Sequence, residues 1–378
     1  MNIPFNKPFL SGSETEYITD AVISGKISGD GKYTKKVHQF FESQMGFQKC
    51  LLTTSCTDAL EMAAILTNIQ EGDEVIAPSY TFVSTVNAFV LRGAKIVFAD
   101  SKSENPNIDE SQIESLITPK TKVIIVVHYA GIACDMDVIM DIAAKHDIVV
   151  VEDAAQAIDS YYKGKRLGSI GSLSAFSFHE TKNIISGEGG MLCINDEKYN
   201  ERAEIIREKG TNRSQFFRGE VDKYGWIDIG SSFLPSDIIA AFLYAQLEKM
   251  NIIQTQRKRI WDKYMEDLSP LKKYQIQLPE IPSYATNNAH MFYLVCTSLA
   301  QRTKLIEYLK GVGIYAVFHY QSLHKSAYYV HQHDGHELLQ SDRYTDCLVR
   351  LPFYYELTDD QQSHIIAHVI KYFEQSES

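Results

Sequence analysis

The chain of 378 residues has no Cys-x-x-Cys pair, no run of Lys and Arg, and no apolar segment of membrane-spanning length. Its six cysteines are scattered, which predicts reduced thiols and argues against both a zinc site and a disulfide framework. With a net charge of −11 and no basic run, the chain lacks the electrostatic footprint of a nucleic-acid-binding protein. The N-terminal residues do not read as a secretion signal. We therefore expect a cytoplasmic protein that has neither nucleic acid nor a membrane as its main partner.

Two kinds of ligand site are also missing from the sequence pattern. There is no Walker phosphate loop and no G-x-G-x-x-G dinucleotide fingerprint. His331, His333 and His336 lie in a polar segment with Asp334, but their spacing fits no pair of ligands on one helix face. We therefore predict no metal site.

Short β-rich runs alternate with segments of helical periodicity from residue 49 onward, and this alternation predicts the fold class. The runs are apolar on both faces, which is typical of a parallel sheet covered by helices on each side. Two more closely spaced strands are expected at 173–178 and 190–195. The expected runs of the first part are 50–53, 74–77, 95–99, 122–127 and 148–153, and the helices between them are 58–68, 82–92, 110–117 and 136–146.

The length of the chain predicts two domains, because it exceeds the usual size of one. Residues 1–25 are expected to form an arm that lies on the main body, and residues 26–250 a large domain. A connector helix and a smaller C-terminal domain, with strands at 291–295 and 314–318, are expected to occupy 251–378. The long polar segment that begins near residue 209 is predicted to serve function or an interface.

Lys182 lies in the stretch SLSAFSFHETKNIISGEGG, four residues after an apolar run that ends at Phe178. Aromatic, hydroxyl and glycine neighbours favour a partly desolvated amine, which loses its proton readily and attacks carbonyl groups. Such lysines form Schiff bases. The alternative, a lysine that merely faces water, stays open on this stretch alone.

Three other segments also follow strands, at the edge where ligands bind in open parallel sheets. The segment 54–60 (TSCTDAL) offers a helix N-terminus for a phosphate group, or else Ser55 is only a helix cap. The Glu152-Asp153 pair offers a carboxylate for a protonated ring nitrogen, or else forms a salt bridge with Lys or Arg. The segment 78–82 (PSYTF) offers an aromatic face, although aromatic residues are usually core. A phosphate site, a flat face, a carboxylate and an amine together match pyridoxal phosphate.

With these motifs in place, the chain resembles the DegT/DnrJ/EryC1/StrS sugar aminotransferases, over nearly its whole length. The resemblance implies the PLP-dependent transferase fold of aspartate aminotransferase type I, with a mixed, mostly parallel sheet between helices and a smaller C-terminal α/β domain. Within the family, the likeness is greatest to the subgroup that makes dTDP-4-amino-4,6-dideoxygalactose for enterobacterial common antigen. It is carried by segments such as SGKISGDG, PSYTFVST, VHYAGIACDMD, FSFHETKN and AEIIREKGTNRSQFFRG.

The resemblance implies a role for each matching residue. Lys182 is similar to the Schiff-base lysine, Asp153 to the partner of the pyridinium nitrogen, and Phe82 to the residue that stacks on the ring. The other implied cofactor contacts are Gln156 near the 3-hydroxyl, Cys56, Thr57 and Ser177 at the phosphate, and His179 in the pocket wall. Much of the family has G-x-N-x-R where this chain has Gly230-Ser231-Ser232-Phe233-Leu234, so Ser232 is expected in place of the Asn that reaches the partner subunit's cofactor.

The implied reaction transfers an amino group from L-glutamate to C4 of dTDP-4-keto-6-deoxy-D-glucose, in a homodimer with active sites at the subunit interface. The gluco epimer of the product, a 3-keto sugar nucleotide and a non-enzymatic sensor remain as alternatives. The weaker candidates for substrate binding are Asn212, Arg213, Lys223, His319, Tyr320 and His324.

Overall fold

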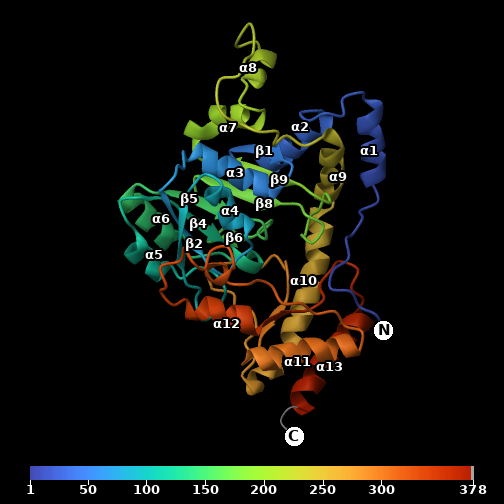
Figure 1. Ribbon diagram of the computed structural model, residues 1–378. Coiled ribbons are helices and arrows are strands. Elements are labelled where there is room, and N and C mark those ends of the chain that lie inside the picture. The colour runs from blue at the N-terminus through green and yellow to red at the C-terminus, as the bar shows by residue number, and fades with distance from the viewer. Residues whose placement is uncertain (376–378) are drawn as a thin grey trace.

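A seven-stranded sheet in the order β1-β9-β8-β5-β4-β2-β3 forms the centre of the computed structural model, which describes residues 1–375 (Figure 1). Strand β9 alone runs against the others, because it pairs antiparallel with both β1 and β8. The predicted mixed, mostly parallel sheet is therefore confirmed. The strands are β1 (Lys49–Thr53), β2 (Glu74–Pro78), β3 (Lys95–Ala99), β4 (Thr121–Val127), β5 (Val149–Asp153), β8 (Leu173–Ser177) and β9 (Gly190–Ile194).

Helices cover both faces of this sheet, as the doubly apolar strands require. In β4, Ile124 and Val126 belong to one buried cluster, while Val123 and Ile125 belong to another on the opposite face. The helices of this part are α2 (Lys32–Gln39), α3 (Cys56–Leu66), α4 (Ser84–Val90), α5 (Glu110–Leu116), α6 (Met136–His146), α7 (Asn200–Arg207), α8 (Arg213–Phe217) and α9 (Asp237–Glu248).

A third buried cluster is formed mainly by the C-terminal part, beyond the break between α9 and α10 (Met250–Asp267), and also includes Ile3, Tyr80, Tyr129, Ala130 and Ile132. The break falls at Lys249, and the boundary expected at 250/251 stays a prediction. Residues 376–378 of the expected C-terminal domain lie outside the described residues. The elements of this part are α10, α11 (Leu299–Gly311), α12 (Leu339–Cys347) and α13 (Asp359–Gln375), with a two-stranded sheet of β10 (Tyr293–Val295) and β11 (Leu348–Arg350).

The N-terminal segment spans both parts of the molecule (Figure 1). Helix α1 (Glu14–Ile23) packs against α9, while Ile3 forms a bridge with Ile314 of the C-terminal part. Residues 314–318 were expected to form a strand, and this was wrong. Ile314 and Val317 form only isolated bridges there, to Ile3 and to Arg350, so no continuous ladder develops.

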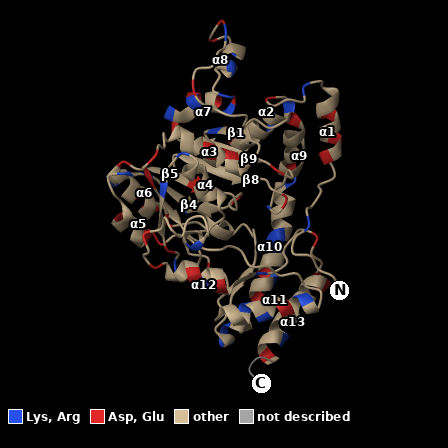
Figure 2. Ribbon diagram, viewed as in Figure 1, with Lys and Arg blue, Asp and Glu red and all other residues tan. Residues whose placement is uncertain are grey.

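Two smaller features lie outside the main sheet and the C-terminal part: a short hairpin and a short helix. The YKGKRLG segment forms a small hairpin of β6 (Tyr161–Tyr162) and β7 (Lys165–Arg166), and the long polar segment contains the short helix α8. Both signs of charge are interspersed along α10, α11 and α13 (Figure 2). Among residues 1–375, none of the helices combines the length and the apolar character that a membrane span requires.

Candidate active site

A cavity of about 450 Å³ opens at the edge of the sheet where β1, β2, β4, β5 and β8 end. It lies where open parallel sheets bind ligands, and it also receives residues of the C-terminal part. Ten of the predicted site residues line it: Cys56, Thr57, Phe82, Asp153, Gln156, Ser177, His179, Lys182, His319 and Tyr320. The sheet thus brings together side chains that are far apart in sequence.

Lys182 extends into this cavity from the loop between β8 and β9. The loop is closed by main-chain hydrogen bonds, in which Lys182 N donates to His179 O (2.9 Å) and Glu180 N donates to Gly187 O (2.9 Å). Burial lowers the pKa of the Lys182 amine below its ordinary value; the Arg350 guanidinium lowers it further, while Asp153 opposes the shift. A larger neutral fraction is what a nucleophilic amine needs.

Asp153 ends β5, and two hydrogen bonds orient its carboxylate. Oδ2 accepts from Thr85 Oγ1 (2.7 Å) and Oδ1 accepts from Ala155 N (3.1 Å). Burial raises the pKa of Asp153, while these hydrogen bonds and the nearby Lys182 amine act in the opposite direction. No Lys or Arg forms a salt bridge with Asp153 in the described chain, so a cationic partner in the cavity would be favourable.

The neighbouring Glu152 points away from the cavity and is fully buried. Its Oε2 pairs with His128 Nε2 (2.9 Å), and its oxygens accept from the amides of Gly168, Ile170 and Gly171. The two carboxylates of the predicted pair therefore have separate roles. Glu152 holds a loop, and Asp153 faces the site.

The N-terminus of α3 supplies main-chain donors at the other end of the cavity. Ser55 caps the helix, because its Oγ accepts from Asp58 N (3.0 Å), and the amides of Cys56 and Thr57 have no acceptor within residues 1–375. A Cβ on Gly190 would lie 2.2 Å from the Ser55 carbonyl, so only glycine lets β9 approach this turn. Both readings of Ser55, cap and part of an anion site, fit this geometry.

The remaining predicted cofactor contacts also have defined surroundings. Gln156 accepts from Ala130 N (2.6 Å) and donates to the Tyr320 hydroxyl (3.2 Å). The Phe82 ring is half exposed and lies 5.8 Å from the Tyr320 ring, centroid to centroid. One face of Phe82 is thus free for a flat ligand.

The donor set fits pyridoxal 5′-phosphate. Free amides and the Gly190 cradle suit its phosphate, Phe82 its ring face, and Asp153 its protonated ring nitrogen. The half-buried Lys182 amine suits its aldehyde. When bound, this cofactor withdraws electrons from the carbon that gains or loses the amino group.

Several cavity residues were missed by the sequence analysis: Phe5, Ser84 and Arg350, which line the cavity, and Thr85, which holds Asp153. Arg350 carried one signal, since it is a lone cation inside the apolar run LVRLPF. Thr85 follows Thr81 at helical spacing, and the two hydroxyls lie 2.8 Å apart.

Five predicted residues do not reach this cavity. Asn212 accepts from Gly225 N (2.9 Å), Arg213 pairs with Glu208 (3.2 Å), and Ser232 forms a bridge with Glu208. Lys223 is exposed in the same polar segment. His324 is buried outside the cavity, with its Nδ1 2.7 Å from Ser79 Oγ. Their assignment to cofactor or substrate binding stays a prediction.

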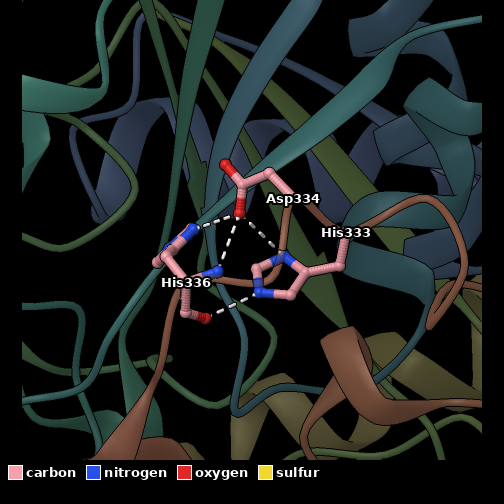
Figure 3. A group of neighbouring side chains, drawn as sticks. All are labelled: His333, Asp334 and His336. Carbon is pink, nitrogen blue, oxygen red and sulfur yellow. Dashed lines mark hydrogen bonds and ion pairs between the residues drawn. The ribbon is translucent and has the colours of Figure 1, made fainter.

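His333, Asp334 and His336 come together in the loop before α12 (Figure 3), with potential ligand atoms within 4.8 Å of one another. Both ring nitrogens of His336 are engaged, Nε2 with Phe98 O (2.9 Å) and Nδ1 with the Asp334 carboxylate. His333 Nε2 donates to His336 O (2.8 Å). These contacts close the loop, and a metal would have to displace them.

Comparisons with known proteins point in one direction. The profile of the DegT/DnrJ/EryC1/StrS aminotransferase family matches residues 9–370. GDP-perosamine synthase of Caulobacter vibrioides is 32% identical over 82% of this chain and 83% of its own length, and that of Escherichia coli O157:H7 is 30% identical over 98% of both chains. A putative sugar aminotransferase of Streptococcus pneumoniae, solved in its PMP form, superposes with a TM-score of 0.91 at 26% identity, covering 99% of this chain and 100% of that one.

Proposed function

The chain belongs to the DegT/DnrJ/EryC1/StrS aminotransferase family and is a pyridoxal phosphate-dependent sugar aminotransferase of fold type I, and from this premise we propose its individual reaction. The proposed enzyme transfers the amino group of L-glutamate to C4 of dTDP-4-keto-6-deoxy-D-glucose. The products are dTDP-4-amino-4,6-dideoxy-D-galactose and 2-oxoglutarate. The observation that carries the amino transfer is the meeting of Lys182 and Asp153 in one cavity beside the open N-terminus of α3, whereas the choice of nucleotide rests on the resemblance of sequence segments.

The proposed roles follow from the position of each side chain. Lys182 would hold the cofactor through its amine and, as a free amine, would move the proton at the reacting carbon. Asp153 stays ionised and holds a proton on the ring nitrogen, which stabilises negative charge at that carbon. The amides of Cys56 and Thr57, with the Ser177 hydroxyl, bind the phosphate. Gln156 and His179 orient the ring from its sides, and Phe82 covers one face.

We further propose that the enzyme is a homodimer with its active sites at the subunit interface. Asn212, Arg213, Lys223 and Ser232 lie outside the cavity of their own chain, in or beside a polar segment that carries exposed aromatic residues such as Phe217 and Trp226. Exposed apolar side chains of this size favour a contact surface. In the proposed dimer this segment serves the partner's cavity.

The dTDP substrate is supported by the resemblance of segments such as AEIIREKGTNRSQFFRG to the dTDP-sugar subgroup. A second candidate is a GDP-linked keto sugar, which is favoured by the similarity to two GDP-perosamine synthases. The two candidates differ in the nucleotide, far from the reacting carbon. Each accounts equally well for Lys182 and Asp153.

One assay separates these candidates. Purified enzyme with L-glutamate is given either dTDP-4-keto-6-deoxy-D-glucose or the GDP-linked 4-keto-6-deoxy sugar, and 2-oxoglutarate release is followed. We expect turnover with the dTDP sugar and at least tenfold lower kcat/KM with the GDP sugar. The reverse preference would assign the GDP sugar. Proton coupling constants at the amine-bearing carbon then distinguish the galacto from the gluco product, and C4 from C3 amination.

Borohydride tests the role of Lys182 independently of the sugar. Reduction of the holoenzyme should fix the cofactor to Lys182, identified by peptide mass, and Lys182→Ala should lose both the visible absorbance and the activity. Lys163→Ala is the matched control, because its amine pairs with Asp137 on the surface. Cofactor fixed to another lysine would refute this role.

A further inference from the structure

Arg350 is a buried cation in the wall of the cavity that has no carboxylate partner. It ends β11 with only 7% of its surface exposed, and no Asp or Glu of residues 1–375 forms a salt bridge with it. Nη1 donates to His319 Nδ1 (3.1 Å), the guanidinium lies 5.0 Å from the centre of the Phe5 ring, and Nε is buried without any hydrogen-bond partner. An unpaired buried charge is costly, so this arrangement calls for an anion from outside the chain.

The other two buried arginines each have a carboxylate or main-chain carbonyl acceptor, although Nε of Arg207, like that of Arg350, is buried without a hydrogen-bond partner. Arg207 pairs with Asp30 (2.6 Å). Arg257 donates to Ala289 O (3.1 Å) and His290 O (2.7 Å), and it does not line the cavity. Arg350 has neither a carboxylate nor a main-chain carbonyl. Its free donors are therefore left for a ligand.

The position of Arg350 indicates which part of a ligand it serves. Burial lowers the pKa of Lys182 and of His319, and the Arg350 charge lowers both further. Burial raises the pKa of Tyr320, and the Arg350 charge opposes that rise. Arg350 thus lies beside His319, whose ring stacks on Tyr320 (5.5 Å between centroids), on the wall that the C-terminal part contributes, whereas the free amides come from the N-terminus of α3.

The chemistry of the two substrates then selects the anion. In an amino acid the α-carboxylate is bonded to the carbon that carries the reacting amine, so it must lie beside Lys182. In a 4-keto sugar nucleotide the charged pyrophosphate is attached across the sugar ring from C4, and no charge lies next to the reacting carbon. A planar guanidinium suits a carboxylate because it can form two parallel hydrogen bonds.

We propose that Arg350 binds the α-carboxylate of the amino donor, with His319 holding the guanidinium in place and Phe5 packing against its face. This inference rests on the proposed function, since it assigns a subsite for the proposed donor. His319 is suited to the positioning role because burial, helped by the Arg350 charge, lowers its pKa to about 4. A neutral ring accepts the hydrogen bond from Arg350 and adds no repulsion.

The two half-reactions test the proposal separately in the holoenzyme. The PLP form is mixed with L-glutamate alone, and the PMP form with the keto-sugar nucleotide alone, each followed by its absorbance change. For Arg350→Gln we expect the apparent Kd for L-glutamate to rise about ten- to a hundredfold, as for loss of a charged hydrogen-bond pair. The sugar half-reaction should change less than about threefold, and Arg350→Lys should recover part of the affinity.

Glutarate supplies a readout that does not depend on turnover. This dicarboxylate has no amine, and it should compete with L-glutamate in the wild type and about tenfold more weakly in Arg350→Gln. Isopropylamine, an amine without a carboxylate, should react equally well with both proteins. Arg302→Gln is the matched control, because Arg302 lies over Phe318 and donates to Asp346 O in the same part of the chain, outside the cavity.

Each other outcome is decisive. Unchanged affinity for L-glutamate would overturn the proposal, and so would an equal loss in the sugar half-reaction, which would assign Arg350 to the sugar nucleotide or to the structure. An assay of the wild-type enzyme with L-glutamate shows whether a failure concerns the role of Arg350 or the proposed function. If the wild type forms 2-oxoglutarate from L-glutamate, the proposed donor stands whatever Arg350→Gln does; if it does not, both fall.

Discussion

Thr85 Oγ1 donates a hydrogen bond of 2.7 Å to Asp153 Oδ2, and both side chains are buried. Thr85 comes from α4 and Asp153 from the end of β5, so this contact joins the helix that follows the aromatic segment to the carboxylate of the site. It favours the charged form of Asp153 against burial, which raises the pKa of this carboxyl group. The proposed role of Asp153 requires that charged form.

Thr85→Val should therefore shift the pH profile of the enzyme. Loss of the hydroxyl removes a hydrogen bond to the charged form, so the pKa of Asp153 rises further and its ionised fraction falls first at low pH. We expect the acid limb of kcat/KM to move to higher pH, and kcat/KM at the optimum to fall about three- to tenfold. Thr67→Val, which loses a hydroxyl at the end of α3, should leave the profile unchanged. A uniform loss at all pH values would contradict the argument.

Sequence reasoning reached the sheet and the large-domain half of the site because both follow from local pattern. Strands that are apolar on both faces are easy to recognise in the sequence; Asp153 ends one such strand and Lys182 follows another. Their convergence follows from the rule that parallel strands end at one edge. The segments 54–60 and 78–82 were found in the same way, while the individual roles of Phe82, Cys56 and Thr57 were implied by the family resemblance.

The cavity residues that come from the C-terminal part were harder to predict from the sequence. Arg350 lines the cavity because β11 and the 314–320 segment reach it from the C-terminal part. Local sequence pattern does not predict how that part is positioned against the sheet. The expected strand at 314–318 failed for a related reason, since its bridges to Ile3 and Arg350 come from opposite ends of the sequence. Contacts of such long separation leave little trace in periodicity.

Glu152→Ala should destabilise the fold around the seven-stranded sheet. The side chains of Glu152 and His128 have no exposed surface, and truncation would leave His128 and three amides without their acceptor. Removing one partner of a buried pair costs about 3–5 kcal/mol. Urea unfolding at neutral pH should show this loss, while Glu114→Ala, at an exposed ion pair, should leave the free energy of unfolding unchanged within error.

The buried pair of Glu152 and His128 also leads to a prediction about pH. Burial raises the pKa of Glu152, but the hydrogen bonds from His128, Gly168 and Gly171 outweigh it, and the net pKa lies below the ordinary value. A lowered folded-state pKa gives stability that is present above the unfolded pKa of about 4.3 and is lost as the pH falls through the folded pKa. The difference in unfolding free energy between wild type and Glu152→Ala should be constant from neutral pH to about pH 5 and shrink below pH 4. A difference that grows on acidification would contradict it.

Metal removal should not affect the enzyme. Both ring nitrogens of His336 already take part in hydrogen bonds, and hydrogen bonds from His336 hold the pKa of Asp334 below its ordinary value against the effect of burial. A metal would have to displace this arrangement. After dialysis against EDTA, activity and the melting temperature should match those of the untreated holoenzyme. A loss that zinc restores would show that the cluster of His333, Asp334 and His336 binds metal.

Mixed dimers test whether the polar segment serves the partner's cavity. Arg213 and Lys223 lie outside the cavity of their own chain, so if they bind substrate they do so across the proposed interface. Arg213→Ala/Lys223→Ala should raise KM for the sugar nucleotide about tenfold or more, as expected for lost contacts to a pyrophosphate. Arg218→Ala, which breaks the ion pairs of Arg218 with Glu204 and Glu220 near the same helix, should have no such effect.

Refolding this double variant together with Lys182→Ala should then restore activity. In each heterodimer, the intact Lys182 of one chain faces the intact polar segment of the other, while the second site lacks both. Random assortment makes half of the dimers mixed, so about a quarter of all sites should recover wild-type KM. Residues acting within their own chain would give no intact site in any dimer. Mixing would then restore nothing, and the proposed exchange across the interface would be wrong.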